Sequence, residues 1–144
     1  MDDQRILHVL EELLSNVPCE FAAIAIQIPK GTDVKWKHAA GNLNDKYKRI
    51  TLRYGKGIAG RVISTGTPIH LDRFPENIIG RDLEYPIMLA EKLISAYAVP
   101  IPLNGSAKGV LLIGRRVRQP FQLKEQKAVR DYTSKLEKMV FIHD

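Results

Sequence analysis

The most chemically suggestive stretch of the chain is rich in glycine: GKGIAGRVISTGTP, residues 55–68. Gly55, Gly57 and Gly60 fit the pattern G-x-G-x-x-G, which opens dinucleotide-binding turns. Glycines at the start of a helix leave its first backbone N–H groups unpaired and accessible, at the positive end of the helix dipole. The same glycines also suit a tight turn that lets a helix pack closely on a sheet. The stretch therefore indicates either a cradle for a small anion or a close-packing turn.

The residues around the glycines argue against a dinucleotide site. Such a site needs a parallel β-α-β unit, with an acidic residue about twenty positions further on to hold a ribose. The helix predicted over residues 57–66 is too short to run back along a sheet, and Glu76 and Asp82 fall in a loop after the next strand. No Gly-Lys-Ser/Thr triplet of a phosphate-binding P-loop is present in the stretch. We therefore predict no dinucleotide site.

The charge of the chain is moderately positive. Its 144 residues include 22 basic and 16 acidic side chains, a formal net charge of +6, and 44% of the residues are hydrophobic. Basic residues gather in KYKR (46–49) and RRVR (115–118), but no helix-turn-helix or zinc-finger pattern accompanies them. We expect a globular protein with no nucleic-acid partner. Its field should attract small anions mildly.

Cysteine and histidine are too sparse for a metal centre. Cys19 is the only cysteine, and none of the four histidines stands at ligand spacing from another. The longest apolar runs are too short to cross a bilayer, and the acidic N-terminus does not fit a secretory signal. We expect a cytoplasmic protein with no cofactor, no metal, no disulfide and no membrane association.

Periodicity and turn residues predict an α+β fold around a mainly antiparallel sheet. The order of elements places a helix at each end of the chain, and we expect these two helices to pack together on one face of the sheet. No linker or repeat divides the chain, which predicts a single domain over residues 1–144. Predicted helices cover residues 1–16, 57–66, 85–94 and 122–142, with a short helical turn at 44–49; predicted strands cover 19–28, 34–41, 50–54, 68–72, 95–103 and 108–117.

In this order of elements, GKGIAGRVISTGTPIHLD resembles the signature of the GAF domain family. YPIMLAEKLISAYAVPI followed by GVLLIG is similar too, as is FQLKEQKAVRDYTSKLEKM as the closing helix. The resemblance spans nearly the whole chain. It implies a GAF domain, with the ligand pocket on the sheet face opposite the terminal helices.

Within that family, the chain is most similar to the nitrate-receptor branch. The likeness lies in VKWKHAAGN, GKGIAG and EYPIMLAE. It implies a small closed pocket in which backbone amides hold nitrate, while an aromatic wall and a helix start line it. The amides implied are those of Ile58, Ala59 and Ile87, and the lining residues implied are Trp36, Tyr85 and Pro86.

The resemblance also implies a partner and a mechanism. In that branch the receptor works with a sensor histidine kinase of an oxygen- and nitrate-responsive two-component system, which regulates transcription. We expect the empty protein to suppress autophosphorylation of the kinase and nitrate to release that inhibition. The terminal helices are candidates for a homodimer contact.

Three other functions are alternatives to the nitrate receptor. A GAF module can bind another small ligand such as a cyclic nucleotide, although Trp36 favours a smaller occupant. It can also act purely as an interaction or dimerisation module. A further branch reduces free methionine sulfoxide, but that chemistry needs several cysteines and Cys19 stands alone. We therefore expect no enzymatic activity.

Overall fold

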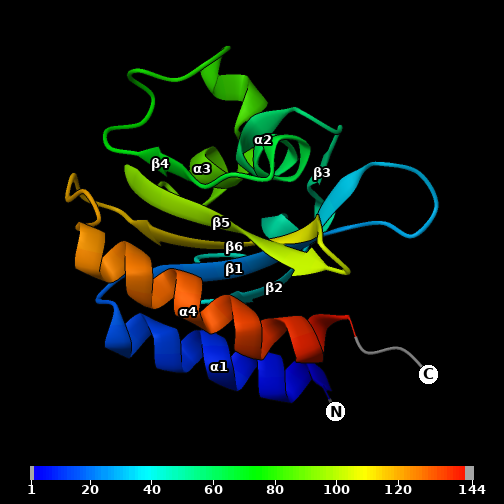
Figure 1. The fold of residues 1–144 in the computed structure, drawn as a ribbon. Helices are drawn as coiled ribbons and strands as arrows, with labels where there is room; N and C mark the ends of the chain where they lie inside the picture. Colours follow the sequence, from blue (N-terminus) through cyan, green and yellow to red (C-terminus); the bar gives the residue numbers. More distant parts are fainter. Residues whose placement is uncertain (1, 142–144) are drawn as a thin grey trace.

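A computed structural model describes residues 2–141 of the chain. Its centre is a six-stranded sheet in the order β3-β2-β1-β6-β5-β4, and every neighbouring pair is antiparallel (Figure 1). The α+β class and the mainly antiparallel sheet are thus confirmed. The strands are β1 (Phe21–Gln27), β2 (Val34–Ala40), β3 (Thr51–Leu52), β4 (Ile69–Leu71), β5 (Ser95–Leu103) and β6 (Ser106–Arg115).

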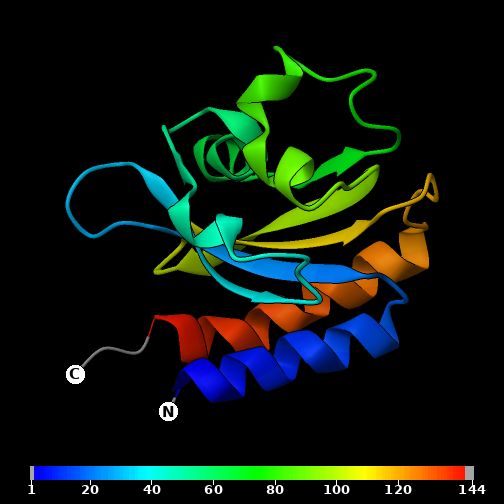
Figure 2. The same cartoon turned by 180° about the vertical axis from the view of Figure 1, so that it is seen from behind.

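Helices cover both faces of the sheet. The long helices α1 (Asp2–Asn16) and α4 (Leu123–Val140) lie side by side on one face, as predicted, while α2 (Gly57–Thr65) and α3 (Pro86–Ala90) lie on the other (Figures 1 and 2). Two short 3₁₀ turns complete the fold, η1 (Lys46–Arg49) and η2 (Asp82–Glu84). No helix within residues 2–141 is long and apolar enough to cross a membrane.

Alternation along β1 separates two hydrophobic cores. Successive strand residues point to opposite faces. Ala22 and Ile24 therefore join the cluster under α1 and α4, whereas Phe21, Ala23 and Ala25 join the cluster under α2 and α3. Because both faces are covered, β1 is apolar at almost every position, which accounts for the continuous run FAAIAI.

The β5–β6 hairpin forms where the sequence predicts it. Asn104 and Gly105 connect the two strands, and both have positive φ angles, 53° and 84°. Two consecutive left-handed residues are the requirement of the type I′ turn, whose twist matches that of antiparallel strands.

Several predicted elements are wrong in extent; the strand predicted over 108–117, for example, covers residues 106–115. The helix predicted over 85–94 ends at Ala90, because Glu91 turns its carboxylate into the interior and Lys92 takes a left-handed φ of 55°. The strand predicted over 50–54 shrinks to two residues, since only Thr51 and Leu52 pair with β2. The last helix ends at Val140, and residue 142 of that prediction lies outside the described residues.

Candidate functional site

The start of α2 packs so closely on its neighbours that only glycine fits there. Gly57 has a φ of +66°, and a Cβ atom on it would lie 2.9 Å from the carbonyl oxygen of Glu84, just before α3. A Cβ atom on Gly60 would lie 2.5 Å from the carbonyl oxygen of Arg53. The glycine stretch is therefore a close-packing turn, and that packing brings the N-terminus of α2 against the segment that enters α3.

The topology excludes the dinucleotide alternative within the described residues. β3 and β4, the strands on either side of α2, lie at opposite edges of the sheet, and β4 pairs antiparallel with β5. No parallel β-α-β unit is formed, so the G-x-G-x-x-G pattern has no dinucleotide fold around it.

The first turn of α2 presents buried backbone donors. Helix geometry gives its first N–H groups no acceptor inside the helix. Lys56, the N-cap residue, makes no side-chain capping bond, and the N–H groups of Ile58 and Ala59 have no backbone acceptor in the loops that the structure describes. Both residues are completely buried. The positive end of the helix dipole is thus directed into the protein interior.

Trp36 adds a third buried donor on the same side of the sheet. The side chain, on β2, is 1% exposed and belongs to the same hydrophobic cluster as Ile58 and Ala59. Its indole N–H, at Nε1, has no hydrogen-bond acceptor among the described residues. A buried donor left unpaired costs about 1–3 kcal/mol. A site that leaves this donor unpaired is suited to a bound ligand that supplies the hydrogen-bond acceptor.

Tyr85 packs against the same cluster from the loop that leads into α3. It is the N-cap residue of α3 and is 3% exposed, and its hydroxyl donates to the carbonyl oxygen of Ile79 at 2.7 Å. Its ring lies 5.8 Å from that of Phe74. Tyr85 therefore fastens the loop between β4 and α3 over this face. Pro86 is the half-buried first residue of α3, and Ile87 behind it is completely buried.

The structure thus places the residues predicted from the sequence on one face of the sheet, opposite α1 and α4. Trp36, Ile58, Ala59, Tyr85 and Ile87 belong to a single buried cluster, and Pro86 adjoins it. None of the six carries a charge. Phe74 belongs to the same cluster, and the carbonyl oxygen of Ile79 accepts from Tyr85. The sequence predicts neither residue, because both lie in an irregular loop whose path no periodicity indicates.

A buried ion pair holds α3 in place. Glu91, the C-cap residue of α3, is completely buried, and its Oε1 accepts from Arg116 at 2.7 Å and from the backbone N–H of Leu43 at 2.8 Å. Arg116 also donates to the carbonyl oxygen of Glu91 at 2.9 Å, and Asn44 donates to that of Ala90 at 3.1 Å. A five-residue helix has little stability of its own, so these contacts fix its direction.

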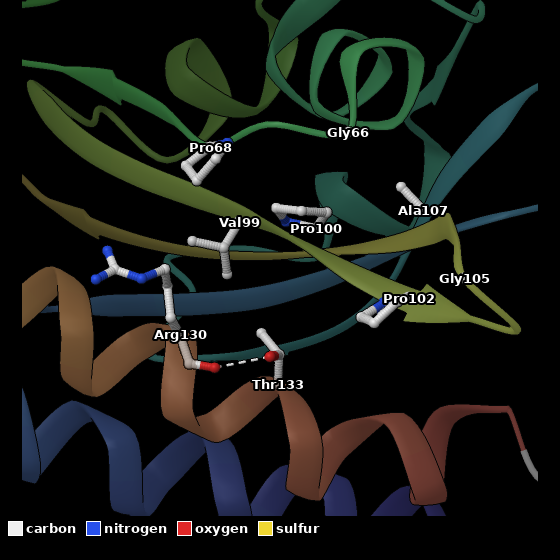
Figure 3. Close-up of a pocket in the computed structure, with 9 residues that line it drawn as sticks. All are labelled: Gly66, Pro68, Val99, Pro100, Pro102, Gly105, Ala107, Arg130 and Thr133. Atoms are coloured by element: carbon white, nitrogen blue, oxygen red, sulfur yellow. Dashed lines mark hydrogen bonds between the residues drawn. The ribbon is translucent and has the colours of Figure 1, made fainter.

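The surface cavities lie away from these residues. Five of them measure about 240 to 490 Å³, and none of the five is lined by a predicted site residue. Figure 3 shows one of about 390 Å³ between α4 and β5. Its two polar side chains are occupied: Arg130 donates to the hydroxyl of Tyr97 at 2.9 Å, and Thr133 donates to the carbonyl oxygen of Arg130 at 2.7 Å.

Thiol and metal chemistry find little support. Burial raises the pKa of Cys19 to about 12, so its thiol stays protonated at neutral pH. Cys19 packs against the cluster under α1 and α4, on the face opposite the candidate site. Among residues 2–141, no group of three or more His, Cys, Asp or Glu side chains could hold a metal ion.

Comparison with known proteins identifies structural relatives. No protein-family model and no curated protein sequence matches the chain. Among solved structures, NreA from Staphylococcus aureus, mutated in its nitrate binding site, is 33% identical, with a TM-score of 0.77 over 83% of this chain and 89% of that one.

Two more distant structures share the fold. The GAF domain of a phosphoenolpyruvate-protein phosphotransferase from Coxiella burnetii is 20% identical, with a TM-score of 0.81 over 96% of this chain and 82% of that one. A free methionine-R-sulfoxide reductase from Thermoplasma acidophilum is 13% identical, with a TM-score of 0.77 over 96% and 92%. With the antiparallel sheet, the paired terminal helices and the likeness to NreA in place, the chain is a GAF domain and belongs to the family of NreA.

Proposed function

We propose that this protein is a receptor for nitrate. The observation that carries the proposal is the indole N–H of Trp36, which is buried without an acceptor among the described residues, in the same hydrophobic cluster as the uncapped first turn of α2. Nitrate would accept from Trp36 and from the backbone N–H groups of Ile58, Ala59 and Ile87. Tyr85 and Pro86 would line the site.

The chemistry of nitrate matches these donors. The ion is planar, fully ionised at neutral pH and weakly hydrated, so fixed neutral donors near a helix N-terminus can hold it without a cationic side chain in the site. With four non-hydrogen atoms and a ceiling of about −1.5 kcal/mol per atom, its binding free energy reaches roughly −6 kcal/mol. That corresponds to a dissociation constant of tens of micromolar at best, an affinity suited to sensing a nutrient.

The likeness to NreA supports a signalling role for the bound nitrate. We propose that the receptor acts in the cytoplasm on a sensor histidine kinase, suppressing autophosphorylation when empty and releasing it when nitrate binds, with transcription as the output. Linkage then requires nitrate to bind the free and the kinase-bound receptor with different affinities. Equal affinities in the two states would contradict this part of the proposal.

The proposal assigns the chain no enzymatic activity, although one structural neighbour is a reductase. Reduction of a sulfoxide by thiols needs an attacking thiolate and a resolving cysteine. Cys19, the only cysteine, has a raised pKa and lies on the other face of the sheet.

Calorimetric titration of the purified chain tests the ligand directly. Nitrate, nitrite, chloride, sulfate and cyclic nucleotides are each titrated into the same protein. We expect saturable heat for nitrate near the tens-of-micromolar range. Saturable heat for a cyclic nucleotide and none for nitrate would replace the proposal with the nucleotide alternative.

A further inference from the structure

The positive charge of this protein is concentrated in one segment. Residues 30–61 hold nine basic and two acidic side chains, a net charge of 9 − 2 = +7. The remaining residues hold 13 basic and 14 acidic side chains, a net charge of −1. We call residues 30–61 the basic segment. It runs through β2, η1 and β3 along one edge of the sheet and into α2, in cyan and turquoise in Figure 2.

The cations of the basic segment have no acidic partner in the part of the chain that the structure describes. None of the nine takes part in any ion pair found among residues 2–141. Seven of them are exposed, and Lys35 and Arg61 are half-buried. The nine cations are Lys30, Lys35, Lys37, Lys46, Lys48, Arg49, Arg53, Lys56 and Arg61.

The same segment contains three of the four donors of the candidate site, those of Trp36, Ile58 and Ala59. Trp36, Ile58 and Ala59 are among its buried residues, whereas seven of its nine cations are exposed. Arg53 and Lys56 are the exposed cations of the turn that leads into α2. The N–H of Lys56, the N-cap residue, donates to the carbonyl oxygen of Arg53 at 3.0 Å, which fixes both residues in the turn before the helix.

We propose that the unpaired cations of the basic segment supply the counter-charge for an anion bound at the buried, uncharged donors, with Arg53 and Lys56 as affinity-determining residues. This inference rests on the proposed function. Taking an anion out of water into a site of neutral donors leaves its charge uncompensated, and charges outside the site act on it through the protein, where screening is weaker than in water. The electric field of these cations also raises the local concentration of small anions and their rate of association.

The test compares two double variants that remove the same charge from different places. Arg53→Gln with Lys56→Gln takes two charges from the basic segment. Lys124→Gln with Lys138→Gln takes two exposed charges from α4, on the opposite face of the sheet. Nitrate is titrated into both variants and the unsubstituted protein at about 20 mM and about 300 mM ionic strength, set with potassium gluconate; these concentrations shorten the Debye length from roughly 20 Å to roughly 6 Å.

We expect nitrate to bind the basic-segment variant about five- to tenfold more weakly at low ionic strength, with a smaller difference at high ionic strength. The α4 variant should stay within about twofold of the unsubstituted protein. Arg53→Lys with Lys56→Arg, which keeps both charges, should restore the affinity and so exclude a loss caused by side-chain shape.

The outcomes separate this inference from the function on which it rests. Equal losses in the two double variants, or no loss in either, would overturn the counter-charge while leaving nitrate binding intact. Failure of the charge-keeping variant to restore affinity would also overturn it. If the unsubstituted protein itself takes up no nitrate at either ionic strength, the proposed function fails, and the inference fails with it.

Discussion

Replacing Trp36 by Phe separates the ligand-binding role of its indole N–H from its packing role. The substitution keeps an aromatic ring on β2 but removes the one buried side-chain N–H that has no acceptor within residues 2–141. If Nε1 donates to nitrate, its loss removes one hydrogen bond to a charged acceptor, about 1.5–3 kcal/mol. We therefore expect nitrate to bind the variant about 10- to 150-fold more weakly.

The ligand-free protein should respond quite differently. Because Nε1 is unpaired there, its removal relieves a penalty of about 1–3 kcal/mol. The smaller ring leaves a cavity that costs a similar amount, so the two effects nearly cancel. We expect the free energy of unfolding without nitrate to change by less than about 1 kcal/mol.

Urea denaturation with and without nitrate measures both effects in one experiment. With a dissociation constant of about 40 µM, 10 mM nitrate stabilises the folded protein by about 3 kcal/mol, and a thirtyfold loss of affinity reduces this to about 1 kcal/mol. Potassium chloride at the same concentration controls for general salt effects. A Trp36→Phe variant that keeps full nitrate stabilisation, but loses about 2 kcal/mol without nitrate, would refute the reasoning, because Nε1 would then be paired within the protein.

Four further predictions concern other parts of the structure. Tyr85→Phe should cost about 1 kcal/mol in urea denaturation, since it leaves the Ile79 carbonyl oxygen without its donor, and should change nitrate affinity less than about threefold; a larger affinity loss would make the hydroxyl a ligand contact. Gly57→Ala should lower the melting temperature by roughly 5–10 °C, about 2–3 kcal/mol, through its φ of +66° and the nearby carbonyl oxygen; an unchanged melting curve would contradict the close packing. His70 accepts the N–H of Phe121, and burial lowers its pKa, so His70 is protonated more readily in the unfolded chain. The free energy of unfolding should therefore fall as the pH drops below 6.5, and it should fall less steeply in His70→Gln. Identical pH slopes of stability in the two proteins would contradict this. Alkylation of Cys19 at pH 8 should be slow in the folded protein and fast in urea, because burial raises its pKa to about 12; equal rates would show an accessible thiolate.

Much of the fold could be predicted from local patterns. The helix at each end of the chain shows apolar residues at three- and four-residue spacing, and each buries that stripe on the sheet. The β5–β6 hairpin depends on two adjacent residues, Asn104 and Gly105, which suffice to set its turn. These elements follow from short-range chemistry, and short-range chemistry is visible in a sequence.

The region around α3 could not be predicted in the same way. The end of α3 is set by the contact between Glu91 and Arg116. These residues lie 25 positions apart, and no local sequence pattern predicts such a pair. The same holds for the candidate site. The sequence shows Trp36 as an aromatic residue in a strand, but only the folded chain shows its indole N–H buried without an acceptor.

Arg115, the last residue of β6, and Arg116, which follows the strand, form ion pairs on opposite faces of the sheet. Arg115 is buried and donates to Glu125 of α4 at 2.7 Å, while Arg116 donates to Glu91 of α3 at 2.7 Å. Sliding either layer over this end of the strand would break a charge-assisted hydrogen bond, so both layers are held in place there. Because Arg115 and Arg116 are adjacent, the two helix layers are attached to the sheet at the same end. A relative movement of the layers that keeps both ion pairs is therefore a rotation about that end.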